Sequence, residues 1–131
     1  ISRIHSGETP LKVWGDGSPI RDFIHASDVA RAMIFVMNNN IEIPVNVSSG
    51  EPTSIKDVVE IIARCFDGAT YQFTENGVSG DNKRLMDISR LKKFGWKPKV
   101  GLEEGIKDTI AWFKSEGFKG YQRYNSFKEE N

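Results

Sequence analysis

Arg21 is the residue whose type and setting most clearly suggest an anion-binding site. It follows a Gly- and Pro-containing turn at residues 16–19 and belongs to a predicted strand at residues 20–24, which would hold it more rigidly than a loop. A guanidinium can donate two parallel hydrogen bonds to neighbouring phosphate or carboxylate oxygens. The residues alone leave two interpretations open. Arg21 is either an anion ligand or an ordinary strand arginine, exposed or paired with Asp22 or Asp28.

A second pair of cations, Lys83 and Arg84, ends a polar, glycine-containing segment that we predict to be a loop over residues 75–83. Loops that carry paired cations often fold over an anionic ligand, where they neutralise its charge and exclude water. The alternative interpretation is a solvated charge pair, which is the usual fate of such doublets. The sequence therefore predicts a second candidate contribution to an anion site.

Aromatic and histidine side chains supply the remaining candidates. Trp14 offers a flat apolar surface with one N–H donor, which suits either stacking on a ring of a ligand or burial in the core. Trp96 follows a predicted helix stop and Trp112 lies on an amphipathic helix, so we expect both in the core, with Trp112 also able to form a subunit contact. His25 is predicted to be a structural histidine. No Cys, His or Asp spacing resembles a metal site.

The predicted elements alternate between strands and helices, which indicates an α/β fold. Two strands, at residues 11–14 and 20–24, flank the turn and are expected to pair as a hairpin or as a strand and its return. A helix follows from Ser27 or Asp28 to Met37, with one of these two residues as its N-cap and Asp28 serving most simply as a cap.

Further elements follow from β-branched runs, helical periodicity and capping signals. Ser54 and Asp57 have the spacing of a capping box, and Gly68 and Gly95 are predicted helix stops. The remaining predictions are strands at residues 45–47 and 70–74, helices over residues 54–66, 88–94 and 102–113, and an irregular tail at 117–131.

Composition narrows the class of protein. The 131 residues suffice for about one domain, and 18 basic residues balance 18 acidic ones. This balance gives no reason to expect bulk attraction to nucleic acid or to an anionic membrane, and no apolar run is long enough to cross a bilayer. The single cysteine, Cys65, cannot form an intramolecular disulfide, which fits a cytoplasmic protein. Because the chain begins at Ile1, we expect it to be part of a longer protein.

Four separated blocks of sequence resemble one enzyme family when taken in order. The blocks are KVWGDGSPIRDFIHASDVA (12–30), VNVSSG with SIKD (45–50 and 54–57), DISRLKKFGWKP (87–98) and LEEGI (102–106). Together they are similar to the extended short-chain dehydrogenase/reductases of the NAD-dependent epimerase/dehydratase family, which act on nucleotide sugars. Within that family, Trp14 and the surroundings of Arg84 most resemble the GDP-L-fucose synthases.

The resemblance implies a Rossmann domain followed by a smaller substrate-binding portion, with the nucleotide sugar bound between them. Residues 1–116 would form that α/β C-terminal portion, built of mixed short strands and helices, and residues 117–131 a tail. The cofactor, NADP or NAD, and the catalytic Ser/Thr-Tyr-Lys group would belong to an N-terminal domain outside this chain. We therefore assign no catalytic, cofactor-binding or metal-binding residue here. The complete protein is expected to be a homodimer.

The resemblance also gives the candidate residues a ligand. Arg21, together with Lys83 or by preference Arg84, would neutralise the diphosphate of the nucleotide sugar. Trp14 would stack on a guanine or a sugar face, and Asp81 would accept a hydrogen bond from the ribose or the base, unless it only solvates the loop. A UDP- or dTDP-sugar 4-epimerase or 4,6-dehydratase of the same superfamily, and a nucleotide-binding module without catalysis, remain alternatives.

Overall fold

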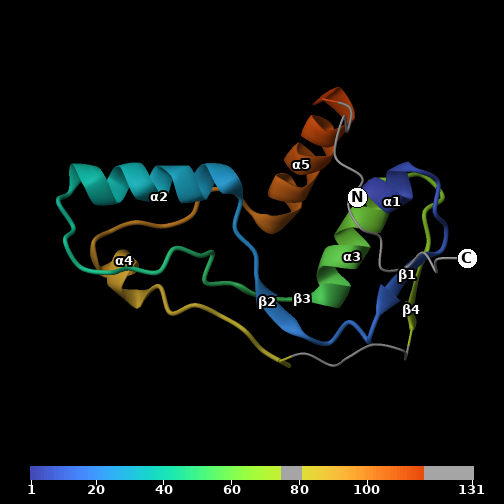
Figure 1. Cartoon of the computed structure of the whole chain (residues 1–131), viewed down its shortest axis with the longest axis horizontal. Coiled ribbons are helices and arrows are strands. Elements are labelled where there is room, and N and C mark those ends of the chain that lie inside the picture. Colours follow the sequence, from blue (N-terminus) through green and yellow to red (C-terminus); the bar gives the residue numbers. More distant parts are fainter. Residues whose placement is uncertain (75–80, 117–131) are drawn as a thin grey trace, which may run out of the picture.

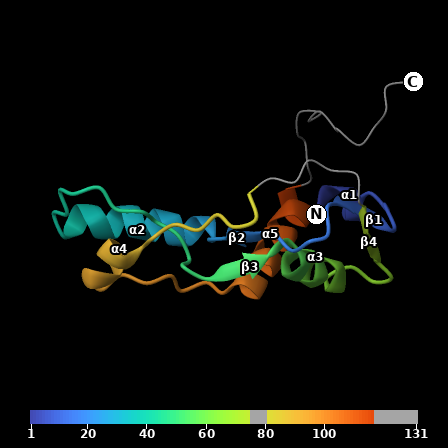
Figure 2. The same cartoon turned by 90° about the horizontal axis from the view of Figure 1, so that it is seen from below.

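The computed structural model describes residues 1–74 and 81–116 and shows short strands among five helices in that part of the chain. Figure 1 shows α2 and α4 at one end of an elongated molecule, α1 with β1 and β4 at the other, and β2 and β3 between them, and Figure 2 shows the same order from below. The predicted α/β character is confirmed. The helices are α1 Ser2–His5, α2 Ala26–Asn38, α3 Ile55–Arg64, α4 Ser89–Lys93 and α5 Leu102–Glu116, and the strands are β1 Leu11–Trp14, β2 Ile20–Asp22, β3 Pro52–Ser54 and β4 Tyr71–Thr74.

The strands form two separate two-stranded sheets. β1 pairs in parallel with β4, whereas β2 pairs antiparallel with β3. The predicted hairpin between residues 11–14 and 20–24 is therefore wrong, and the second strand ends at Asp22. Both strands exist, but each pairs with a strand far along the chain. A parallel pair such as β1 and β4 needs a long crossover connection, and α3 forms part of the connection between these two strands.

The turn between β1 and β2 packs against α3 and β4, which explains why the two strands diverge. The backbone amides of Ile55 and Lys56 donate to the carbonyls of Pro19 and Gly17 at 3.0 and 2.9 Å. Gly17 has φ +80°, and a Cβ placed there would lie 2.5 Å from the ring of Phe73. Glycine is therefore required here both for its backbone conformation and for its missing side chain.

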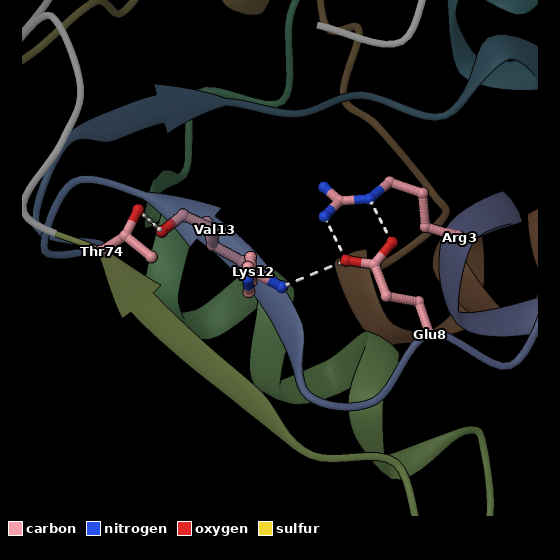
Figure 3. Close-up of polar contacts among 5 residues, drawn as sticks. All are labelled: Arg3, Glu8, Lys12, Val13 and Thr74. Atoms are coloured by element: carbon pink, nitrogen blue, oxygen red, sulfur yellow. Dashed lines mark hydrogen bonds and ion pairs between the residues drawn. The ribbon is translucent and has the colours of Figure 1, made fainter. Parts of the chain in front are cut away.

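The start of β1 is held to α1 by charged and backbone groups, as Figure 3 shows. The Arg3 guanidinium forms an ion pair with the Glu8 carboxylate, and Arg3 Nε donates to Glu8 Oε2 at 2.7 Å. The Lys12 amide donates to the same carboxylate at 3.4 Å. The hydroxyl of Thr74, at the end of β4, donates to the Val13 carbonyl at 3.3 Å. Arg3 is thus an arginine with an internal ion-pair partner, Glu8.

Predicted helix boundaries that depend on local signals are confirmed. The capping box of α3 is complete, because Ser54 Oγ accepts from the Asp57 amide at 3.0 Å and Asp57 Oδ2 accepts from the Ser54 amide at 3.1 Å. Gly95 follows α4 with φ +91°, the left-handed conformation expected of a helix stop. The expected strand at residues 45–47 is wrong, because within the described residues this segment pairs with no strand. Its valines instead pack against a buried cluster of Ala32, Leu91 and Trp96.

Asp28 does not cap α2, contrary to the sequence prediction. The helix begins at Ala26, and Asp28 lies in its first turn with no exposed surface. One carboxylate oxygen accepts from the backbone amides of Lys99 and Val100, both at 3.0 Å, and the carboxylate pairs with Arg31. Asp28 thus fastens the segment that leads into α5, a contact across more than 70 residues that no local pattern signals.

The tryptophans of the C-terminal half have different environments. Trp96 is in the core, as predicted, but Trp112 is 61% exposed, so the prediction that it is buried is wrong. It lies on the outer side of α5, whose inner side buries Ile110. Within the described part, no helix is both long and apolar enough to cross a membrane.

Candidate functional site

The candidate anion site forms around β2, the strand that carries Arg21. β2 has β3 on one side and residue 83 on the other. The Ile20 amide donates to the Asn82 carbonyl at 2.8 Å, and the Arg84 amide donates to the Ile20 carbonyl at 3.0 Å. The segment from 82 to 84 therefore runs parallel to β2. This pairing brings together two cationic segments that are about 60 residues apart in the sequence.

The register of this pairing places Arg84, and not Lys83, on the side of Arg21. Directly paired residues in a sheet point to the same face, and successive residues point to opposite faces. Lys83 pairs with Ile20 and so shares its face. Arg21 and Arg84 each come one residue later in parallel segments, and therefore project from the opposite face together. This geometry supports the preference for Arg84 over Lys83.

Asp81 lies within electrostatic reach of both arginines. Its carboxylate accepts from Arg84 Nη2 at 2.5 Å and from Arg84 Nε at 3.2 Å. The hydrogen bond from Arg84 and the positive charge of that residue lower the pKa of Asp81, and the charge of Arg21 lowers it further. Arg21 itself donates from Nη1 to the Ile20 carbonyl at 2.8 Å. The structure therefore brings Arg21, Asp81 and Arg84 into one cluster, which we call the arginine cluster.

The ion pair in the arginine cluster lies open to solvent. The side chains of Arg84 and Asp81 are 75% and 61% exposed. An exposed pair of this kind contributes about 0–1 kcal/mol to stability. A stronger anion can therefore replace the Asp81 carboxylate at Arg84 with little loss of stability.

Trp14 lies in a different part of the structure. It ends β1 in the β1–β4 sheet, and its side chain is half exposed. The arginine cluster belongs to the β2–β3 sheet, on the far side of the turn at residues 15–19.

The turn at residues 15–19 also bears on where a dinucleotide cofactor could bind. Because it leads from β1 into β2 and not into a helix, it does not fit the glycine-rich cradle that holds a dinucleotide pyrophosphate.

An apolar cavity of about 150 Å³ lies between the end of β2 and the start of α5. His25 lines it and shares a hydrogen bond between Nδ1 and the Ser27 hydroxyl at 2.8 Å, and its structural role stays a prediction. The arginine cluster is not part of its lining. The described residues hold no group of His, Cys, Asp or Glu that could bind a metal ion.

Two sets of predictions fall partly or wholly outside the described residues. The loop predicted at 75–83 is described only from residue 81, and the tail at 117–131 is not described. Tyr124 and Lys128, in that tail, have the four-residue spacing of a Tyr-x-x-x-Lys pair. The prediction that the chain carries no catalytic group therefore stays a prediction.

Sequence comparison relates the chain to one enzyme family. Residues 1–48 match the NAD dependent epimerase/dehydratase family. The chain is also 38% identical over 120 residues to a probable GDP-L-fucose synthase 1 of Oryza sativa subsp. japonica, an alignment that covers 86% of this chain and 36% of that protein. These matches support an extended short-chain dehydrogenase/reductase that resembles the GDP-L-fucose synthases. The chain spans about a third of the length of the curated relatives that it matches.

Two solved structures of enzymes that act on nucleotide-linked sugars share the fold. A GDP-6-OMe-4-keto-L-xylo-heptose reductase from C. jejuni is 31% identical with a TM-score of 0.69, covering 83% of this chain and 35% of its own. A UDP-N-acetylglucosamine 4-epimerase from Methanobrevibacter ruminantium M1, solved with UDP-N-acetylmuramic acid, is 31% identical with a TM-score of 0.71, covering 88% and 37%. These similarities confirm the predicted extended short-chain dehydrogenase/reductase resemblance.

Proposed function

We propose that this chain binds the nucleoside diphosphate of a nucleotide sugar, GDP-linked by preference, in an NAD(P)-dependent epimerase or reductase. The observation that carries the proposal is the position of Arg21 and Arg84 on one face of the β2 ladder. Two adjacent phosphates present several anionic oxygens, and two guanidiniums side by side match that charge distribution. Asp81 already provides an anion to this cluster and would give way to the diphosphate.

Binding of the diphosphate would contribute to catalysis by positioning the sugar. Binding energy from a group remote from the reacting carbon orients the sugar for hydride and proton transfer. NADP or NAD supplies the hydride chemistry, and we propose that residues outside this chain hold it, since the turn at residues 15–19 does not fit a dinucleotide. Residues 1–116 would then form the substrate-binding portion and 117–131 a tail. A cytoplasmic homodimer is the proposed state of the complete enzyme.

A UDP- or dTDP-sugar 4-epimerase or 4,6-dehydratase is the second candidate. The similarity to a 4-epimerase solved with a UDP-linked ligand favours it, because the arginine cluster recognises phosphates and is indifferent to the base. A nucleotide-binding module without catalysis is a third. Trp14, by stacking, and Asp81, by accepting a hydrogen bond from a base edge, are the candidate residues that could distinguish bases.

A titration followed by NMR tests the binding proposal and separates the candidates. We expect GDP to shift the backbone amide signals of residues 20–22 and 82–85 in the isotope-labelled 131-residue chain. GMP should need at least about tenfold higher concentration for the same effect, because one phosphate cannot engage both arginines fully. Tighter binding of UDP or dTDP than of GDP would favour the second candidate. Equal responses to GDP and GMP would contradict the proposed diphosphate site.

A further inference from the structure

Asp22 follows Arg21 on β2 and therefore projects from the opposite face of the strand. Its Oδ1 atom accepts from the Ser49 amide at 3.0 Å and from the Ser49 hydroxyl at 2.5 Å. Burial raises the pKa of Asp22, but the hydroxyl and backbone donors around the carboxylate outweigh it, and the net pKa is lowered. The carboxylate is therefore ionised at neutral pH and forms charge-assisted hydrogen bonds.

This hydrogen bonding holds the loop at residues 46–50 to β2, and the loop is in turn attached to the segment that follows Arg84. Asn46 Nδ2 donates to the Asp87 carbonyl at 3.0 Å. A Cβ placed on Gly50 would lie 2.7 Å from Ile88 Cδ1, so the loop also packs closely on Ile88. β2 is thus connected, through the loop, to the chain three and four residues beyond Arg84.

The Arg84 segment has few other attachments to β2. Among the described residues, a single isolated bridge pairs it with the strand, through the two backbone hydrogen bonds at Ile20. One bridge fixes the chain at a single point, and its course beyond that point depends on further contacts. The attachment of Asp87 and Ile88 to the loop supplies these contacts and so supports the direction in which Arg84 projects.

We propose that Asp22 is a positioning residue, whose carboxylate clamps the loop at residues 46–50 to β2 and so, through the contacts of that loop with Asp87 and Ile88, keeps Arg84 beside Arg21. The inference rests on the proposed diphosphate site and adds to it a residue that touches no ligand. Loss of the clamp would leave both arginines present but no longer held at one spacing. Two groups held at the right spacing bind a bidentate ligand more tightly than two that must be ordered on binding.

Asp22→Asn is the informative substitution, because asparagine keeps the size of the side chain but loses its charge. Its amide nitrogen cannot accept a hydrogen bond, so it would face donors that it cannot satisfy. We expect affinity for GDP to fall about fivefold to tenfold, within the range for the net contribution of a single hydrogen bond. Asp16→Asn is a matched control. Asp16 accepts from the Ser18 amide and hydroxyl at 2.9 and 2.7 Å but contacts only its own turn, so GDP affinity should not change.

A double-mutant cycle separates positioning from a general loss of structure. We expect Asp22→Asn to weaken GDP binding in the native chain but to change it less than twofold in the Arg84→Ala background, since the residue acts through Arg84. Equal losses in both backgrounds would overturn the inference. Circular dichroism confirms that each variant is folded. If Asp22→Asn does not fold, Ser49→Ala can replace it, because this substitution removes only one hydroxyl donor to Asp22. We expect Ser49→Ala to show the same coupling with Arg84→Ala. A lack of coupling between these two substitutions would contradict the clamp.

The outcome also distinguishes the inference from the proposed function. If neither Arg21→Ala nor Arg84→Ala weakens GDP binding, the diphosphate site itself is wrong. If both weaken it while Asp22→Asn binds GDP as tightly as the native chain, the site stands and the positioning role of Asp22 is wrong.

Discussion

Replacing Arg21 with alanine is expected to weaken GDP binding to this chain by about 10-fold to 100-fold, the range for loss of hydrogen bonds between a guanidinium and a phosphate. Arg21 lies on a strand that is paired on both sides, so its backbone is already ordered before the ligand binds. Removal of the side chain should leave the strand intact, since the one hydrogen bond lost is that from Arg21 Nη1 to the carbonyl of the preceding residue, Ile20. The same titration that measures GDP binding to the native chain measures the effect.

Two further variants define what Arg21 contributes. Arg21→Lys keeps the charge but loses the planar fork, so it should recover only part of the affinity. Arg3→Ala removes a guanidinium that is paired with Glu8 near α1, and it should leave GDP affinity within a factor of two. An equal loss for Arg3→Ala and Arg21→Ala would indicate a general effect of net charge and would contradict a local site.

Asp28→Ala is expected to cause the largest loss of stability, lowering the free energy of unfolding by about 3–5 kcal/mol. The substitution removes a fully buried carboxylate and leaves the Arg31 guanidinium without its partner. It also leaves the amides of Lys99 and Val100 without an acceptor, and an unsatisfied buried donor costs about 1–3 kcal/mol. α5 begins two residues later, so its attachment to α2 should loosen.

Urea denaturation followed by circular dichroism measures this loss. Ser54→Ala is the matched comparison, because it removes a capping interaction of α3 and should lower the free energy of unfolding by only about 1 kcal/mol. A loss for Asp28→Ala no greater than that for Ser54→Ala would show that the buried pair does not hold the C-terminal segment.

Features that depend on neighbouring residues could be predicted from the sequence. The capping box at Ser54 and Asp57 and the helix stop at Gly95 are each decided within a few residues, and the structure confirms them. The amphipathic pattern of α5 likewise predicted the helix. Trp112 lies off the apolar stripe that contains Leu102, Ile106 and Ile110, so its exposure agrees with the helical period, and the expectation that it is buried did not follow from that pattern.

Features that depend on partners far along the chain could not be predicted in this way. The chain around residues 15–19 has the composition of a hairpin turn, but β1 and β2 pair with β4 and β3 instead. Asp28 has the residue type and sequence position of a helix cap, but its carboxylate accepts hydrogen bonds from the backbone amides of residues 99 and 100 instead. The bridge between Ile20 and Lys83 likewise has no local signal. Arg21 and Arg84 were predicted to act together only because of the resemblance to the family.

The central claim is that Arg21 and Arg84 converge on one diphosphate, and a crystal structure of the chain with GDP tests it most directly. The account predicts phosphate oxygens within about 2.7–3.2 Å of both guanidiniums, with the Asp81 carboxylate displaced from Arg84. A diphosphate bound elsewhere, with Arg84 still paired to Asp81 and Arg21 not in contact, would contradict it.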